Sequence, residues 1–226
     1  MQTCDIKATH TELVDWKGNY PPSKPWLIKH YVKNLSEVIP TVTAFDAEAW
    51  CATHATLPNG DFCTNTYAGL DKDLAAALLH VINGTVGDFG AGGGWYSSYF
   101  QNNSIQSTPY DASPTRPASV QFADLSTPLK ASIPTYDWVL CLEVGGHLSS
   151  DFENIFIDNI AGHATSGIVI SWAVPGQGGN GHVNTRPNNW VIEQLRSRTF
   201  TYDKDASEMI RTKATFDWFK NTLMVF

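Results

Sequence analysis

Apolar residues after position 70 recur first at the spacing of a helix. In the segment "DKDLAAALLHVING", Leu74, Leu78 and Val81 fall on one helical face. Asp71 can cap the first turn, and Gly84 suits the position that follows a helix end. The pattern predicts a helix that leads directly into the next apolar run.

Short apolar runs bounded by turn residues then predict strands. There are seven of them: "TVGDFG", "SIQSTPY", "ASVQFADL", "YDWVLCLEV", "SGIVISWAV", "RTFTYD" and "NTLMVF". Two helical patterns lie between them, "RPNNWVIEQLRSR" and "SSDFENIFIDNIAGHA", and the second places Phe152, Ile155, Phe156 and Ile160 on one face. Alternating strands and helices indicate parallel pairing, and an unbroken apolar run such as "GIVIS" indicates a strand covered on both sides. The expected fold class is therefore α/β, a doubly wound sheet.

The first seventy residues have a different character. They are irregular and rich in aromatic residues, with turn signals such as "YPPSKP" and "LPNGDF". We expect residues 1–70 to form an N-terminal cap of the same domain, and residues 71–226 to form its core. The aromatic residues of the cap either line a binding pocket or make a satellite core, and the sequence leaves both open. They are Trp16, Tyr20, Trp26, Tyr31 and Tyr67.

Charge and cysteine usage narrow the function classes. The 226 residues carry 22 acidic and 15 basic side chains, and the basic ones are scattered. The sequence shows no cluster of basic residues that could bind a phosphate backbone, so we expect no nucleic-acid partner. No apolar run is long enough for a membrane span and the amino terminus does not resemble a signal peptide, which favours a cytoplasmic protein without a membrane partner. Cys4, Cys51, Cys63 and Cys141 show no metal-ligand spacing, so we expect free thiols and no metal site.

The segment "VGDFGAGGGWY" holds the clearest chemical signal. Five of the eight residues from 87 to 94 are glycine, between a predicted strand and a predicted helix. Such a turn lets a ligand approach the main chain and the unpaired amides of the helix start. A phosphate-binding P-loop is excluded because no lysine follows, and a dinucleotide fingerprint fails because Trp95 stands where the third glycine should be. Asp88 before the turn suits a ligand with an ammonium group.

On these residues the chain resembles the class I S-adenosylmethionine-dependent methyltransferases, whose first motif is acidic-x-Gly-x-Gly-x-Gly. The resemblance covers roughly residues 71–226. It implies a seven-stranded Rossmann-like sheet, mostly parallel with an antiparallel last strand, and S-adenosylmethionine as cofactor. It also implies that Asp88 serves the amino end of the cofactor and that Asp111, 23 residues later, binds the ribose hydroxyls.

Further positions match the family less strictly. Asp124, after the third strand, would accept from the adenine amino group, although it equally suits a turn cap. "YDWVLCLEVGGHL" is similar to the family's fourth-strand segment, but Gly146 stands where relatives often carry Glu. The cofactor-binding residues that the resemblance implies are Asp88, Gly90, Ala91, Gly92, Tyr96, Asp111, Asp124, Leu125, Glu143 and Val144.

The acceptor side is less defined. The chain lacks the Asn/Asp-Pro-Pro-Tyr run of many methyltransferases that act on nucleobase or amide nitrogens. This favours a small-molecule acceptor, with a protein side chain as the alternative. The polar loop after the fifth strand offers Gln177, His182, Asn184 and Arg186 as substrate contacts. The alternative is that His182 and Asn184 pin the loop to the next helix by side-chain hydrogen bonds. In the cap, the candidate substrate-binding residues are Tyr20, Trp26, Tyr31 and Tyr67.

His147, just past the fourth strand, is the candidate general base, with a structural role as the alternative. The predicted activity is methyl transfer by in-line displacement to a nitrogen, oxygen or sulfur atom. A catalytically inactive, methyltransferase-like binding or regulatory subunit is the alternative function. A nicotinamide-dependent oxidoreductase is disfavoured by Trp95. The sequence leaves a homodimer open.

Overall fold

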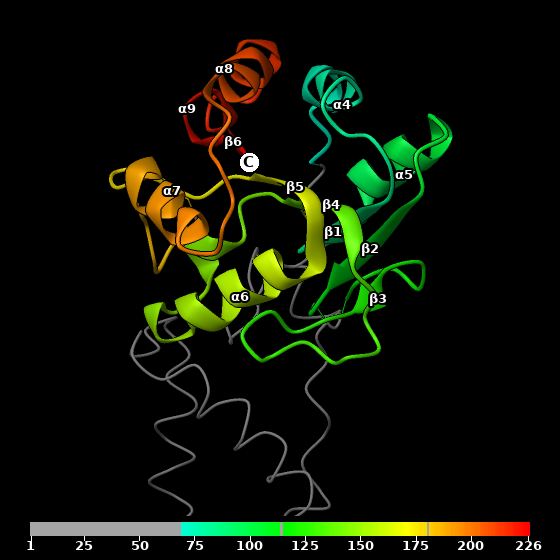
Figure 1. Ribbon diagram of the computed structural model, residues 1–226, viewed down its shortest axis with the longest axis horizontal. Coiled ribbons are helices and arrows are strands. Elements are labelled where there is room, and N and C mark those ends of the chain that lie inside the picture. The colour runs from blue at the N-terminus through cyan, green and yellow to red at the C-terminus, as the bar shows by residue number, and fades with distance from the viewer. Residues whose placement is uncertain (1–68, 114, 180) are drawn as a thin grey trace, which may run out of the picture.

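A single six-stranded sheet forms the centre of the part of the chain that the computed structural model describes, residues 69–113, 115–179 and 181–226 (Figure 1). The strand order is β3-β2-β1-β4-β5-β6. The strands are β1 (Val86–Phe89), β2 (Ser107–Asp111), β3 (Gln121–Phe122), β4 (Tyr136–Cys141), β5 (Ala164–Ile170) and β6 (Met224–Val225). All neighbours pair in parallel except β5 and β6, which are antiparallel. The expected α/β sheet with an antiparallel last strand is confirmed.

Helices cover both faces of this sheet. One face carries α4 (Lys72–Leu78), α5 (Trp95–Asn102), α8 (Lys204–Lys213) and α9 (Phe219–Thr222). The other carries α6 (Glu153–His163) and α7 (Asn188–Arg196), as Figure 1 shows. Two short 3₁₀ turns, η1 (Gly145–His147) and η2 (Ser150–Phe152), lead from β4 into α6.

Alternating strand residues supply the two halves of the core. In β1, Val86 packs toward α4 and α5, whereas Phe89 packs toward α6. All four residues of β1 are buried. Successive side chains of a strand point to opposite faces, so a strand covered on both faces reads as one apolar run. This confirms the doubly wound arrangement.

The sixth predicted strand, "RTFTYD", is wrong: the described residues contain six strands instead of seven. The helical winding of α7 continues into this segment, because the amides of Arg198 and Phe200 donate to the carbonyl of Leu195. Thr199 then takes a left-handed conformation at φ 71°, which a strand does not accommodate. Asp203 makes one isolated bridge to Val225 and caps α8 by accepting from the amide of Ala206.

Two helix details also differ from expectation. The helix α4 begins as predicted, with the Asp71 side chain accepting from the amide of Leu74, but it ends at Leu78. Gly84 is therefore not its C′ residue; it lies at φ 108° in the turn before β1, where a side chain would meet Asp137. In α6 the fully buried apolar residues are Phe156, Ile157 and Ile160, while Ile155, and Phe152 just before the helix, are only half-buried.

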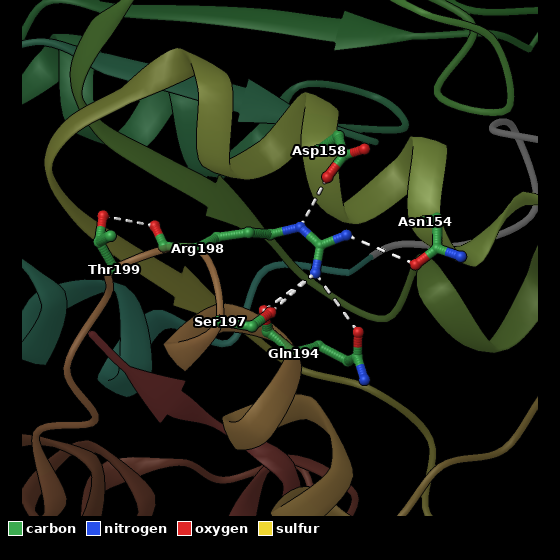
Figure 2. Close-up of polar contacts among 6 residues, drawn as sticks. All are labelled: Asn154, Asp158, Gln194, Ser197, Arg198 and Thr199. Atoms are coloured by element: carbon green, nitrogen blue, oxygen red, sulfur yellow. Dashed lines mark hydrogen bonds and ion pairs between the residues drawn. The ribbon is translucent and has the colours of Figure 1, made fainter.

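A polar latch around Arg198 holds the end of α7 against α6 (Figure 2). The Arg198 Nε donates to Asp158 Oδ1 at 2.6 Å, and its Nη2 lies 3.5 Å from Asn154 Oδ1; both partners belong to α6. The Nη1 donates to the carbonyl of Gln194 in α7 at 3.0 Å. One mostly buried guanidinium thereby joins both helices that cover this face of the sheet.

Within the described ranges, no helix is long and apolar enough to span a bilayer. Of the predicted cap, only residues 69 and 70 belong to the described part of the chain. The cap therefore stays a prediction.

Candidate active site

The candidate site lies at the carboxyl ends of β1, β2 and β4. The strand order reverses between β1 and β4, and ligands of open α/β sheets bind at such a switch point. The glycine segment connects β1 to α5 at this place, as the sequence predicts. A surface hollow of about 780 Å³ is lined by Trp138, Ser166 and Tyr202. It opens near the amino ends of β4 and β5 and does not belong to this site.

The glycine turn needs its glycines for conformation and for space. Gly90, Gly92 and Gly94 take φ values of 81°, 55° and 76°, a region that side chains disfavour. A Cβ atom on Gly90 would collide with Val144, which follows β4. The amides of Gly90 and Ala91 both donate to the carbonyl of Tyr110, at 2.8 and 2.9 Å, and so fix the turn to β2.

Asp88 is a buried carboxylate directly beneath this turn. It is 4% exposed, and its Oδ2 accepts from Ser97 Oγ in α5 at 2.8 Å; that hydroxyl also lies 2.8 Å from Ser107 Oγ. Burial raises the pKa of Asp88 to about 7, aided by the nearby charge of Asp111 and opposed by the bonds from Ser97. A carboxylate that is costly to ionise is stabilised by a bound cation, so the position suits an ammonium group.

Asp111 ends β2 and ties it to the glycine turn. Its Oδ2 accepts from the amide of Gly92 at 2.8 Å, and its Oδ1 accepts from the amide of Ser113 at 2.7 Å. The predicted cofactor acid and the predicted cofactor turn are therefore in direct contact.

Asp124 and Leu125 follow β3. Asp124 Oδ1 accepts from the amide and the hydroxyl of Ser126, at 3.1 and 2.6 Å, which matches the turn-cap interpretation. The Leu125 side chain is buried in the core, and its carbonyl accepts from Asn159 Nδ2. Their roles in cofactor binding stay predictions.

Glu143 holds an unusual backbone conformation two residues past β4. Its φ of 55° is uncommon for a residue other than glycine and marks local strain. Its amide donates to Ser171 Oγ at 2.8 Å, and its Oε2 accepts from Gln177 Nε2 at 2.9 Å. Burial raises the pKa of Glu143, while these partners and the nearby His182 oppose the rise. The strained backbone thus places a carboxylate on the same edge as Asp88.

Tyr96 points away from the glycine turn toward α4. Its side chain is 8% exposed, and its hydroxyl accepts from the amide of Asp71 at 3.3 Å. Burial raises the pKa of this phenol. The geometry thus gives Tyr96 a link between α5 and the start of α4, and its predicted cofactor contact stays a prediction.

His147 and His182 face each other across the edge, with ring centroids 4.8 Å apart. His147 Nδ1 lies 3.0 Å from the Gly181 carbonyl, an acceptor, so Nδ1 carries the proton. Burial, together with His182, lowers the pKa of His147 to about 4, against the opposing effect of the Gly181 carbonyl. The imidazole is therefore neutral near pH 7 and a weak base.

The other predicted loop residues have partners of different kinds. Gln177 binds Glu143, as described above, and Asn184 is buried with its carbonyl accepting from Trp172 Nε1 at 2.7 Å. Arg186 is paired with Glu153 at 2.5 Å and stacks on Trp190 at 4.8 Å. The Asn184 bond is made by its main chain, and within the described ranges its side-chain Nδ2 is buried without a hydrogen-bond partner. Both interpretations of these loop residues stay predictions.

Sequence reasoning missed several residues that shape the site. Ser97 binds Asp88, Ser171 holds Glu143, and Thr222 lies 3.4 Å from Glu143 Oε1. Serine and threonine are too common for a pattern to single them out. The predicted aromatic residues Trp16, Tyr20, Trp26, Tyr31 and Tyr67 lie outside the described residues.

Known structures with a similar fold were found for this chain, but no sequence relatives. No family model matches the chain, and no curated protein matches its sequence. Among solved structures, an O-methyltransferase family protein from Burkholderia thailandensis is 13% identical, with a TM-score of 0.58, over 91% of this chain and 70% of that one. Magnesium protoporphyrin IX methyltransferase from Synechocystis, solved with bound S-adenosylhomocysteine, is 14% identical, with a TM-score of 0.51, over 85% and 97%. The chain therefore shares the fold of class I methyltransferases.

Proposed function

We propose that the chain is an S-adenosylmethionine-dependent methyltransferase that acts on a small-molecule acceptor. The observation that carries the proposal is the placement of two acids around one glycine turn: Asp88 is buried in β1, two residues before the turn, and Asp111 accepts from the amide of Gly92. A dinucleotide would bring a pyrophosphate close to these carboxylates, which is unfavourable. A sulfonium cofactor with an ammonium group and a ribose brings a cation and hydroxyl donors instead.

The donor set fits this cofactor. Asp88 offers negative charge to the ammonium group and Asp111 offers acceptors to the ribose hydroxyls. A Cβ built on Gly92 would collide with nothing, since its nearest neighbour is the Trp95 ring at 3.6 Å, an ordinary contact distance. Bound S-adenosylmethionine would supply an activated methyl group on its sulfonium sulfur. The contribution of the chain is then to orient the reactants and exclude water, effects worth up to about 7–11 kcal/mol of barrier.

Two observations support a small-molecule acceptor. The net charge of −7 with scattered basic residues disfavours a nucleic-acid substrate. One of the two solved structures above is named for magnesium protoporphyrin IX, which is a small molecule. A cytoplasmic location and a homodimer stay predictions.

The proton chemistry of the proposed reaction is modest. His147 is neutral and has a low pKa, so it is poorly suited to deprotonate a hydroxyl group. Its catalytic role stays a prediction, and the site suits an acceptor with little need of a base.

Calorimetry of the full chain tests the proposal. S-adenosylmethionine and S-adenosylhomocysteine should bind, and nicotinamide dinucleotides should not. Binding of the dinucleotides in place of the sulfonium cofactor would contradict the proposal. Binding of S-adenosylhomocysteine without turnover on any acceptor of a broad small-molecule panel would favour the inactive-subunit alternative.

A further inference from the structure

An aromatic cluster between α8 and α9 has no part in the cofactor site described above. It consists of Phe216, Trp218 and Phe219, and we call it the aromatic ledge. The ring centroids of Phe216 lie 4.8 Å from Trp218 and 6.1 Å from Phe219. Phe219 is buried, whereas Trp218 is 43% exposed. A rigid support thus presents one large aromatic side chain to its surroundings.

Two anchors hold the ledge at the edge of the sheet where the candidate site lies. Asp71 Oδ2 accepts from the amides of Thr215 and Phe216 at 2.6 and 2.9 Å. Burial by itself would raise the pKa of Asp71, but these amides and that of Leu74 outweigh it and hold the pKa below its usual value. The carboxylate therefore stays charged and fixes the ledge to the start of α4.

The second anchor leads directly to Glu143. Thr222 Oγ1 lies 2.7 Å from the carbonyl of Trp218 and 3.4 Å from Glu143 Oε1. The main chain of Trp218 and the carboxylate of Glu143 thus contact the same hydroxyl. Trp218, whose side chain is 43% exposed, and the half-buried carboxylate of Glu143 are thus joined through Thr222 near the carboxyl end of β4.

Two cationic side chains near the ledge are already engaged. Lys220 pairs with Asp217 at 2.7 Å, and Arg211 Nε donates to the carbonyl of Leu223 at 2.7 Å. The surroundings of Trp218 and Glu143 therefore favour a positive ligand, since both a carboxylate and the face of a tryptophan attract cations.

We propose that the aromatic ledge and Glu143 bind the acceptor, and that the atom methylated is a neutral ring nitrogen of a planar aromatic compound, which becomes cationic in the product. This inference rests on the proposed function and deepens it. The ledge supplies an acceptor-binding wall from the C-terminal part of the chain, in addition to the aromatic residues predicted in the cap.

The charge balance of the step agrees with the groups present. The nitrogen lone pair forms the new N–C bond while the S–C bond breaks toward sulfur, which becomes a neutral thioether. The positive charge passes from sulfur to nitrogen, and no proton has to leave. Trp218 and Glu143 stabilise the charge that develops on the nitrogen. A hydroxyl acceptor would instead need a base, and the neutral imidazole of His147, with Nδ1–H on the Gly181 carbonyl, is a weak one.

Binding of product-like cations to the full chain saturated with S-adenosylhomocysteine tests the proposal. The probes are N-methylpyridinium and N-methylquinolinium, each compared with a neutral hydroxyl compound of the same ring size, phenol and 1-naphthol. At least one cation should bind more tightly than its neutral counterpart. Trp218→Ala should weaken that binding about tenfold, and Trp218→Phe should retain most of it. Glu143→Gln should weaken the cation and leave the neutral compound unchanged.

The controls separate this inference from the proposed function. Phe122 is also an exposed aromatic residue, 54% exposed, but it lies in β3 at the other end of the sheet. Phe122→Ala should leave cation binding unchanged. Failure of S-adenosylhomocysteine to bind would overturn the proposed function. If it binds but neither cation does, if the neutral compounds bind equally well, or if Trp218→Ala has no effect, the acceptor proposal alone is overturned.

Discussion

Asp88 shows how one buried residue reveals both a function and its cost. A carboxyl group that is 4% exposed and bonded mainly to one serine destabilises the fold when it ionises. An asparagine at this position would stabilise the cofactor-free fold at least as well as Asp88 does. Its charge becomes useful only when a cation binds at the glycine turn.

The first prediction concerns the pH dependence of stability at Asp88. Its pKa is about 7 in the folded chain and about 3.8 in the unfolded chain. Between these values the folded chain keeps a proton that the unfolded chain loses, so the cost to stability grows as the pH rises and is complete above about 7. Asp88→Asn should therefore raise the free energy of unfolding by up to about 4 kcal/mol at pH 8 and little at pH 4.

Urea unfolding of the cofactor-free protein at both pH values measures this. The control is Asp73→Asn, which changes an exposed aspartate of α4 and should have a small effect at either pH. Loss of stability in Asp88→Asn at pH 8 would show that the carboxylate is structural.

Residue types also explain which site predictions could be made from the sequence. Asp88, Asp111 and the glycines were predictable because a strand-turn-helix unit requires specific residue types at fixed places. The tight turn requires glycines, and a positively charged or hydroxyl-bearing ligand requires acids beside it. Trp218 was not, because an aromatic residue between two helices is typical of a core position. Only its 43% exposure and its link to Glu143 through Thr222 distinguish it.

At the scale of elements, the glycine turn fits against the segment after β4. A Cβ on Gly90 would collide with Val144, whereas a Cβ on Gly92 would make an ordinary van der Waals contact with the Trp95 ring at 3.6 Å. Gly90→Ala should cost about 3 kcal/mol of unfolding free energy, and Gly92→Ala about 1 kcal/mol, the cost of its left-handed conformation.

A double-variant cycle isolates the collision. Gly90→Ala combined with Val144→Ala should cost at least 1 kcal/mol less than the sum of the two single changes, because the smaller side chain leaves room. Additive costs in urea unfolding would mean that the two segments do not press on each other.

The latch between α6 and α7 gives a matched pair of arginines. Arg198 is mostly buried and reaches both helices (Figure 2). Arg196, at an exposed position of α7, pairs with the exposed Glu193. Arg198→Ala should cost about 1–2 kcal/mol of unfolding free energy, and Arg196→Ala about 0–0.5 kcal/mol. Equal costs would show that the latch adds nothing beyond a surface ion pair.

Elements differ in how far the sequence predicts them. β1, α5 and α7 were predictable because their apolar periods and turn residues agree. The segment "RTFTYD" has the composition of a strand, but tertiary context overrides it, since α7 continues into it and Asp203 caps α8. The end of α4 was not predictable from Gly84, because that glycine lies in the turn before β1 and not directly after the helix.

At the scale of the whole molecule, the parallel sheet brings distant segments to one edge. Asp88, Asp111 and Glu143 lie 23 and 32 residues apart along the chain, yet Asp88 lies next to the end of β1, Asp111 ends β2 and Glu143 follows β4. The alternation of strands and helices predicts this convergence. The partners that tune each acid depend on side-chain packing, so they appear only in the structure.

The central claim is that Asp88 receives the cation of a bound sulfonium cofactor or its product. At pH 7 about half of Asp88 is protonated in the free protein, because its pKa is about 7. An ammonium group beside it lowers that pKa, so binding expels the proton. The direct measurement is calorimetry of S-adenosylhomocysteine binding at pH 7 in two buffers that differ in ionisation enthalpy. We expect release of about half a proton with the wild type, and none, together with at least tenfold weaker binding, with Asp88→Asn. Equal affinity and equal proton release in the two proteins would contradict the account.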